Sequence, residues 1–240
     1  KNDELIFTNS RSKAVNQNTK IDANSFKYNK KLNTLNAKGD VKVEDHIKKF
    51  VILSEDITYY KNKEKFISKS KSEAFGDNLN IKAKEFEYDK TLNIVNAYNN
   101  VIIEDKIEEL LIFTENITYL RNKEIIFTQG YTEALVQSKY NFNSKNTKLL
   151  RNEKILQSKE KTVVTDDDDT VYNLDNFEYL IDTKLLKGNG INVITNNNKD
   201  KSDQFTFSSG IFDFQTKKFS GKDTKVLLHK NIFIKEKEKF

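Results

Sequence analysis

The chain of 240 residues contains no cysteine, methionine, proline or tryptophan, and only two histidines. Without cysteine there is neither a disulfide nor a thiolate metal site, which is compatible with any compartment. Because methionine is absent, we expect the chain to be a processed product or a fragment of a longer protein, from which any signal peptide has been lost. No window approaches the roughly eighteen apolar residues of a membrane-spanning helix.

Arginine is also scarce, so the formal charge of +5 and the pI near 9.0 come almost entirely from lysine. The lysines are interleaved with Asp and Glu, and the abundance of Lys, Asn, Ile and Phe is typical of a coding bias. The charge therefore allows a weak attraction to phosphate groups without requiring one. With 36% hydrophobic and 32% charged residues, the composition fits an array of thin stacked units.

The most informative feature present is an internal repeat, in which residues 21–75 recur without a gap as residues 81–135. Phe26, Tyr28 and Ala37, for example, return 60 positions later as Phe86, Tyr88 and Ala97, because 86 − 26 = 60. A fixed period predicts stacked structural units, each burying its apolar face against its neighbours.

Each repeat is itself doubled, which gives an elementary module of roughly 30 residues, enough for two strands and two turns. Residues 35–43 alternate apolar and polar side chains, as expected of a strand with one wet face. The runs are rich in Ile, Val, Phe, Tyr and Thr, which favour strands over helices. Turn signals between them predict antiparallel hairpins at residues 29–31, 61–63, 89–91, 121–123, 182–184 and 215–217.

Degenerate copies of the module follow around residues 177–193 and 211–228, so the repeat extends nearly from end to end. Residues 159–170 interrupt it and are predicted to form a polar loop at strand ends. No sharp shift of composition marks a linker. We therefore predict a single domain over residues 1–240.

Candidates for catalysis or metal binding are few. His46 follows a predicted strand end and His229 lies between Leu and Lys, and neither has a nucleophile motif around it. The tetrad of aspartates at residues 166–169 lacks the interrupted spacing of a calcium loop, so a solvated acidic loop is the better interpretation than a cation site. Gly188-x-Gly190 lacks the third glycine of a dinucleotide site and indicates a turn or bulge. We predict no catalytic residue, no metal and no cofactor.

Two features recur at the same place in both copies. Glu-Asp pairs stand at residues 44–45 and 104–105, and since an active site is usually singular, this repetition favours a strand end over chemistry. Tyrosines interleaved with lysines raise the possibility of a single-stranded nucleic-acid platform. The same rings share a strand face with apolar residues, so core packing is the better interpretation, and we predict no nucleic-acid partner. These tyrosines are Tyr28, Tyr59, Tyr88 and Tyr119.

The inward positions of successive modules should align into a continuous apolar stripe. If the two sheet faces close on each other this stripe is only a core, and if they splay it becomes an open trough. Small residues at intervals favour the trough. The predicted inward residues are Phe26, Tyr28, Leu35, Ala37, Val41, Val43, Ile52, Ile57, Tyr59, Phe86, Tyr88, Val95, Ala97, Val101, Ile103, Ile112, Ile117, Tyr119, Phe177, Tyr179, Ile191 and Val193.

The two copies share the order Ile21-x-Ala23-x-x-Phe26-x-Tyr28, a turn, then Leu35-x-Ala37-x-Gly39-Asp40-Val41-x-Val43, which returns from Ile81 to Ile103. This order gives the chain a resemblance to the OstA-like repeat of the lipopolysaccharide-transport proteins. The resemblance covers most of the chain and departs from the pattern at Asn99-Asn100, which replaces the Gly-Asp step. Length favours the N-terminal periplasmic domain of the family's outer-membrane assembly protein, because the single-domain bridge members are generally shorter.

The resemblance implies an elongated, all-β antiparallel jellyroll, V-shaped in section (a β-taco), whose apolar interior receives the acyl chains of lipopolysaccharide. It implies a periplasmic location at the outer membrane and edge-to-edge pairing with an LptA-like bridge protein. An outer-membrane barrel and its lipoprotein are further implied partners. Each sheltered methylene contributes about 0.8 kcal/mol, so a few acyl chains would be held firmly while similar rungs allow sliding.

We therefore expect a non-enzymatic conduit, in which the inward residues named above contact acyl chains. The main alternative is a structural or adhesive β-solenoid with a closed core and no lipid ligand. A third possibility, an enzyme of the β-helix class, would need a carboxylate cluster on an outer face, for which residues 166–169 are the only candidate.

Overall fold

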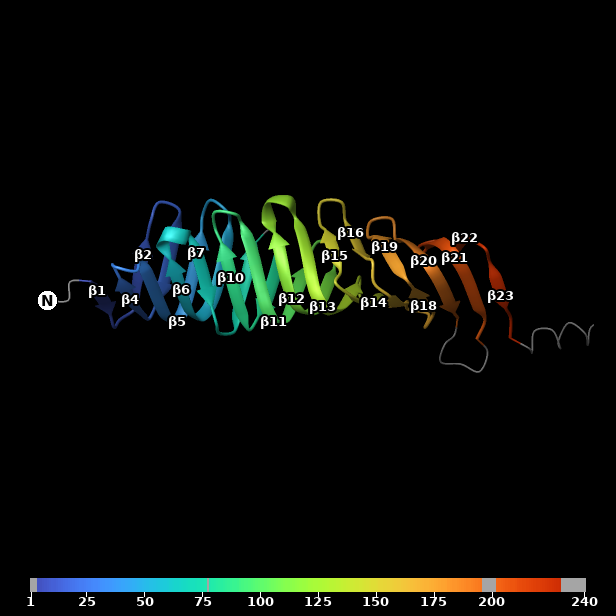
Figure 1. The fold of residues 1–240 in the computed structure, drawn as a ribbon, viewed down its shortest axis with the longest axis horizontal. Coiled ribbons are helices and arrows are strands. Elements are labelled where there is room, and N and C mark those ends of the chain that lie inside the picture. The colour runs from blue at the N-terminus through green and yellow to red at the C-terminus, as the bar shows by residue number, and fades with distance from the viewer. Residues whose placement is uncertain (1–3, 77, 196–201, 230–240) are drawn as a thin grey trace, which may run out of the picture. The chain divides into compact units, whose positions relative to one another are not determined.

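The computed structural model describes residues 4–76, 78–195 and 202–229, and these fold almost entirely into antiparallel strands (Figure 1). This confirms the predicted all-β antiparallel fold of jellyroll type built from hairpin repeats. The described residues form two compact units, unit 1 (Lys1–Thr128) and unit 2 (Gln129–Phe240). The single domain over residues 1–240 stays a prediction.

Unit 1 contains most of the repeat at residues 21–75 and 81–135. Its elements are β1 (Leu5–Thr8), β2 (Ser12–Val15), β3 (Thr19–Ala23), β4 (Ser25–Asn29), β5 (Thr34–Asp45), β6 (Phe50–Tyr60), the 3-10 helix η1 (Lys61–Lys63), β7 (Lys65–Ser68), β8 (Ser72–Gly76), β9 (Leu79–Ala83), β10 (Glu85–Asp89), β11 (Ile94–Asp105), β12 (Leu110–Leu120) and the 3-10 helix η2 (Arg121–Lys123). Strand β13 (Ile125–Val136) begins in unit 1 and ends in unit 2.

The strands of unit 1 form two hydrogen-bonded layers. The A layer runs β1–β4–β5–β6–β7–β10–β11–β12 through the halves of the long strands at residues 34–38, 57–60, 94–98 and 117–120. The B layer runs β2–β3–β5–β6–β8–β9–β11–β12 through their other halves. The long strands therefore pass from one layer into the other, and the apolar side chains of both layers face inward.

A bulge marks the crossing point in both copies. The register of β5 against β6 shifts between Lys38 and Val41, and that of β11 against β12 shifts between Tyr98 and Val101. Gly39 has φ +77°, and Asn99 and Asn100 have φ +64° and +60°. Asn tolerates the left-handed region better than other non-glycine residues. This is why Asn-Asn can replace Gly-Asp at the same bend.

The bulge also reverses the alternation in the partner strand. In β6, Ile52 and Ser54 are buried, and so are Ile57 and Tyr59, three and five residues after Ser54. The inward positions therefore change from even to odd numbers within one strand. The one-residue change is the expected consequence of a bulge that leaves one residue unpaired.

The predicted turns are confirmed. Residues 30–33, 90–93, 181–184 and 214–217 form turns between strands, and the turns at 61–63 and 121–123 are η1 and η2. Asn33 and Asn93, at the same position of the two copies, end their turns with φ +51° and +56°. Each turn joins consecutive antiparallel strands, as the hairpin interpretation requires.

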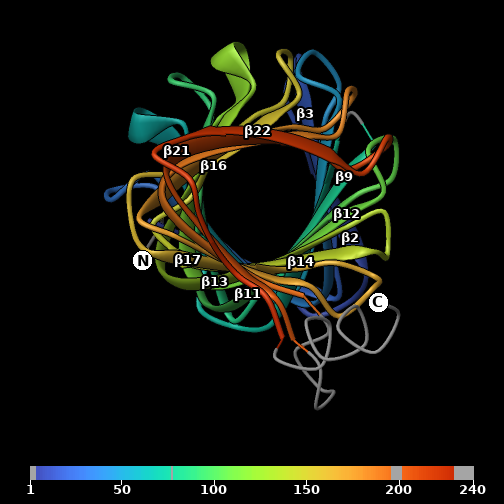
Figure 2. The same ribbon diagram turned by 90° about the vertical axis from the view of Figure 1, so that its right-hand side faces the viewer.

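Unit 2 continues the same kind of pairing with shorter strands. It contains β14 (Tyr140–Lys145), β15 (Lys148–Leu150), β16 (Ile155–Ser158), β17 (Thr162–Thr165), β18 (Val171–Leu174), β19 (Asn176–Leu180), β20 (Leu185–Ile194), β21 (Gln204–Asp213), β22 (Lys218–Lys222) and β23 (Lys225–Leu227). Strands β20 and β21 are its long pair, and β22 lies beside β21 (Figure 2). The polar loop predicted for residues 159–170 is wrong in part. Thr162–Thr165 form β17, which pairs with both β14 and β18 because Thr162 and Val164 face the core.

Candidate functional site

The structure places the predicted inward residues on the inner faces of the layers. All of the residues predicted in this set are buried except Tyr28 and Leu35, which are partly exposed. Those in unit 2, namely Phe177, Tyr179, Ile191 and Val193, have at most 4% of their surface exposed. Twenty of the twenty-two side chains predicted to point inward are thus buried, and their contact with acyl chains stays a prediction.

In the second copy of unit 1 the interior is a closed core. Val95, Ala97, Ile103 and Ile112 are 0% exposed, and Tyr88 is 1% exposed. Side chains of the two layers therefore pack against each other across β9 to β12. Of the two alternatives left open by the sequence, a filled interior is the one found along these strands.

The first copy of unit 1 differs, because a cavity of about 390 Å³ opens there. Its volume falls within the range of about 300–1,000 Å³ that is typical of ligand pockets. The exposed residues Lys13 and Lys61 are part of its wall. We call it the N-terminal cavity; it is lined by Ile6, Thr8, Ser12, Lys13, Ala14, Val15, Asn16, Thr19, Ile21, Phe26, Tyr28, Leu35, Tyr59 and Lys61.

Four of these lining residues, Phe26, Tyr28, Leu35 and Tyr59, belong to the predicted acyl-chain contacts. Sequence reasoning missed the rest, which come chiefly from β1 and β2. Those strands carry few repeat signals, since only the repeat from residue 21 onward has a second copy to compare with. Ile6 and Val15 are 49% and 71% exposed and place apolar surface at the outermost rung.

A second cavity, of about 230 Å³, lies in unit 2 among aromatic side chains of β21 and β22. Phe207 and Phe212 approach with ring centroids 5.7 Å apart, and Phe212 and Phe219 lie 6.0 Å apart. Phe219 is 51% exposed and belongs to β22, whose residues are all exposed. The outer rung of unit 2 thus also leaves aromatic surface uncovered.

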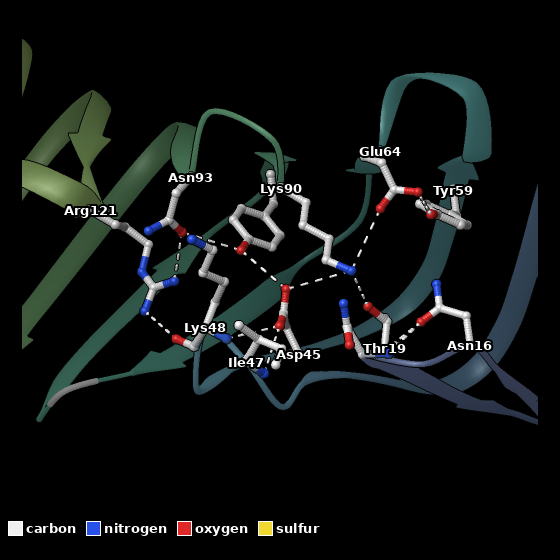
Figure 3. Close-up of polar contacts among 12 residues, drawn as sticks. Asn16, Thr19, Asp45, Ile47, Lys48, Tyr59, Glu64, Lys90, Asn93 and Arg121 are labelled. Atoms are coloured by element: carbon white, nitrogen blue, oxygen red, sulfur yellow. Dashed lines mark hydrogen bonds and ion pairs between the residues drawn. The ribbon is translucent and has the colours of Figure 1, made fainter.

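Hairpin ends of the A and B layers meet in a polar cluster in unit 1 (Figure 3). Asp45 ends β5 in the B layer, and its carboxylate accepts hydrogen bonds from the backbone N–H groups of Ile47 (3.1 Å) and Lys48 (2.9 Å). Asp105 accepts the equivalent bond from Ile107 (3.1 Å) in the second copy. The repeated Glu-Asp pairs therefore mark strand ends, as predicted.

Three side chains of the A layer reach this B-layer turn. Lys90 Nζ donates to Thr19 Oγ1 (2.7 Å) and lies 4.0 Å from the Asp45 carboxylate. The Tyr88 hydroxyl lies 3.5 Å from Asp45. Arg121 donates through Nη2 to the Lys48 carbonyl (3.0 Å). Polar contacts thus connect the hairpin ends of the two layers directly above the closed core.

Two buried tyrosines of unit 1 have raised pKa values. Burial, and then the nearby Asp45 carboxylate, raise the pKa of Tyr88 well above its ordinary value. Burial and a hydrogen bond to Glu64 (2.7 Å) raise the pKa of Tyr59 in the same direction. Both phenols therefore stay neutral at physiological pH and serve as donors, and neither has the lowered pKa of an activated nucleophile.

The acidic tetrad at residues 166–169 forms an internally bonded loop. Asp166 is buried and accepts hydrogen bonds from the backbone of Thr170 (2.9 Å) and from the Tyr172 hydroxyl (3.0 Å). Lys217 Nζ lies 3.3 Å from Asp167 and 2.7 Å from Asp168. The carboxylates of Asp166 to Asp168 lie close enough together to hold a metal ion. In the structure, Lys217 supplies the compensating charge, in line with an acidic loop.

The other candidates from the sequence have structural positions. His46 lies exposed in the turn after Asp45. Gly190 has φ +57° and lies within β20, whose pairing with β21 keeps its register from Asn189 to Ile191, so the turn or bulge predicted at Gly188-x-Gly190 is not found there.

No protein-family model matches the chain, and no curated protein matches its sequence. Within residues 4–76, 78–195 and 202–229, no helix has the length and apolar character needed to cross a membrane.

Proposed function

We propose that the chain is a non-enzymatic module that holds the acyl chains of a lipopolysaccharide-type glycolipid between its two layers. The observation that carries the proposal is the N-terminal cavity, an apolar space of about 390 Å³ that opens onto the inward side chains of the repeat. Phe26, Leu35 and Ile21 offer it apolar surface, and burying a methylene there contributes about 0.8 kcal/mol.

The charges at the cavity suit a ligand with an anionic head. Lys13 and Lys61 lie in the cavity wall and are exposed, so each ammonium group can stay in water while its stem contacts an apolar chain. A glycolipid with phosphates beside its acyl chains matches this arrangement.

The proposal extends to partners and location, following the resemblance. The chain would act in the periplasm as the N-terminal domain of an LptD-like outer-membrane assembly protein and receive lipid from an LptA-like bridge. Strand β1 pairs with β4 on one side, and no strand among the described residues pairs with its other side. A free edge of this kind can pair with a strand of another chain.

A structural β-stack without a ligand is the second candidate, and the closed core of the second copy favours it. Side chains that are 0% exposed, such as Val95 and Ile112, leave no room for an acyl chain unless the layers separate. The two candidates differ in whether lipid binds at all.

Titration with lipid A in detergent-free buffer tests the proposal, with tyrosine fluorescence as the signal. Leu35→Asp places a charge in the cavity wall at a partly exposed position, so the fold should survive while lipid binding weakens about tenfold or more. Leu32→Asp is the matched control, because Leu32 is 64% exposed and is not part of the cavity wall. Absence of lipid A binding to the parent chain would reject the proposal in favour of the structural stack.

A further inference from the structure

We propose that the polar cluster of unit 1 is a latch that holds the A and B layers together and must open before an acyl chain can pass along the second copy. The inference rests on the proposed function, since it describes how lipid would move beyond the N-terminal cavity. We define the latch as Lys90, Tyr88 and Arg121 of the A layer with Asp45, Thr19 and the Lys48 carbonyl of the B layer.

The latch lies where the two layers can separate. The two layers are continuous at the bulges, where the long strands cross, so they can separate only at their hairpin ends. The latch contacts connect those ends: Lys90 to Thr19 at 2.7 Å, and Arg121 to the Lys48 carbonyl at 3.0 Å. Figure 3 shows the Lys90 side chain extending across to Asp45 and Thr19. Any widening between the A-layer ends at Lys90 and Arg121 and the B-layer ends at Thr19, Asp45 and Lys48 must therefore break these contacts.

The two copies of the repeat differ in the environment of the corresponding lysine. Lys90 and Tyr88 correspond to Lys30 and Tyr28, 60 positions earlier. Lys30 is exposed and Tyr28 is partly exposed, and the N-terminal cavity opens beside Tyr28. Lys90, by contrast, has 13% of its side chain exposed, and the interior below it is closed. The interior is thus open at the copy whose lysine is in water and closed at the copy whose lysine spans the layers.

The contacts of the latch include charged groups. The Asp45 side chain is 1% exposed, and its charge is balanced by the turn amides and by Lys90. Hydrogen bonds to charged groups are individually stronger than neutral ones, yet they return to water when the hairpin ends separate. Such contacts can therefore hold the layers closed and still allow them to separate reversibly. The apolar core by itself has no polar groups whose lost hydrogen bonds water could replace.

Electron-spin distance measurements test the latch without any ligand. The cysteine-free chain accepts spin labels at Ile47→Cys and Leu92→Cys, two residues that are 66% and 59% exposed in the hairpin turns of the B and A layers. We expect one narrow distance distribution in the labelled parent and a longer, broader one after Lys90→Met. Lys30→Met is the matched control and should leave the distribution unchanged.

A distribution for Lys90→Met that equals the parent's would overturn the latch. If Lys90→Met does not fold, Thr19→Val decides, because it removes the acceptor of Lys90 while keeping the shape and strand preference of the side chain. This variant should shift the distances in the same direction by less, and an unchanged distribution would again reject the proposal.

Lipid A uptake by the same variants separates the latch from the proposed function. If the latch controls entry, the uptake rate should rise about tenfold in Lys90→Met, from the loss of a charged hydrogen bond. A parent that binds no lipid A would refute the proposed function, while the distances between the spin labels would still test the latch. In the other case, the parent binds lipid A while Lys90→Met shows longer spin-label distances but an unchanged uptake rate. That result would refute the latch and leave the proposed function standing.

Discussion

Truncation of one inward side chain should show whether the interior of unit 1 is packed in solution as tightly as in the structure. Ile103 lies in the B-layer half of β11 and is 0% exposed, and it pairs with Ile81 of β9 and Ile112 of β12. Ile103→Ala would leave a cavity between these neighbours. Because buried Ile-to-Ala changes remove transfer energy and also create a cavity, we expect a loss of about 2–5 kcal/mol of unfolding free energy.

Ile102→Ala is the control, since Ile102 is the adjacent residue of the same strand, is partly exposed and faces outward. The two variants lose the same atoms and the same strand preference, so their difference isolates packing. We expect the control to lose about 1 kcal/mol or less. Urea titration followed by circular dichroism and tyrosine fluorescence measures both, and the transition of unit 1 should be analysed separately if the units unfold in two steps. Equal losses for the two variants would refute a closed core and favour an open trough.

Three further predictions concern the bend, the buried phenol and the lysine of the acidic loop. Asn100→Ala should lower the unfolding free energy by about 1 kcal/mol, because Ala tolerates φ +60° poorly, whereas Asn100→Gly should cost little; equal urea midpoints for both would contradict the argument. Burial raises the pKa of Tyr172, so in the unfolded state this tyrosine loses its proton at lower pH, and the unfolding free energy should fall as pH rises through the ordinary value of 10.0. Tyr172→Phe should flatten this fall in alkaline urea titrations. An unchanged slope would count against the buried phenol as its cause. A hydrogen bond to Asp168 raises the pKa of Lys217, so the contribution of Lys217 to the unfolding free energy is complete below pH 10.5 and is lost at higher pH. Lys217→Met should remove this pH dependence. A variant that keeps the dependence would show that the ion pair is not responsible.

Much of the fold could be predicted because it is written in short-range patterns. Residues 35–43 alternate with period two, and Asn33 and Asn93 end turns of the same length in both copies. Such features depend on the local geometry of strands and turns, so a repeat at a fixed offset makes them recognisable. The inward direction of Val41, Val43 and Ile103 followed from the same alternation.

The errors also have local causes. Thr162–Thr165 were missed as a strand because the aspartates that follow give this short segment the composition of a loop. The lining of the N-terminal cavity by β1 and β2 was missed because the repeat begins only at residue 21.

The sequence by itself determined most elements of the repeat, their hairpin order and the side of these strands that faces inward, because these depend on residues close together along the chain. Only the tertiary structure decided that the second copy is filled while the first leaves a cavity, and that Lys90 meets Asp45 across the layers. The two residues stand 45 positions apart (90 − 45 = 45), and the chain between them passes from one layer into the other, so the distance between the two charges depends on the whole pairing pattern of unit 1. Lys30 and Lys90, which hold the same position in the two copies, consequently have different environments.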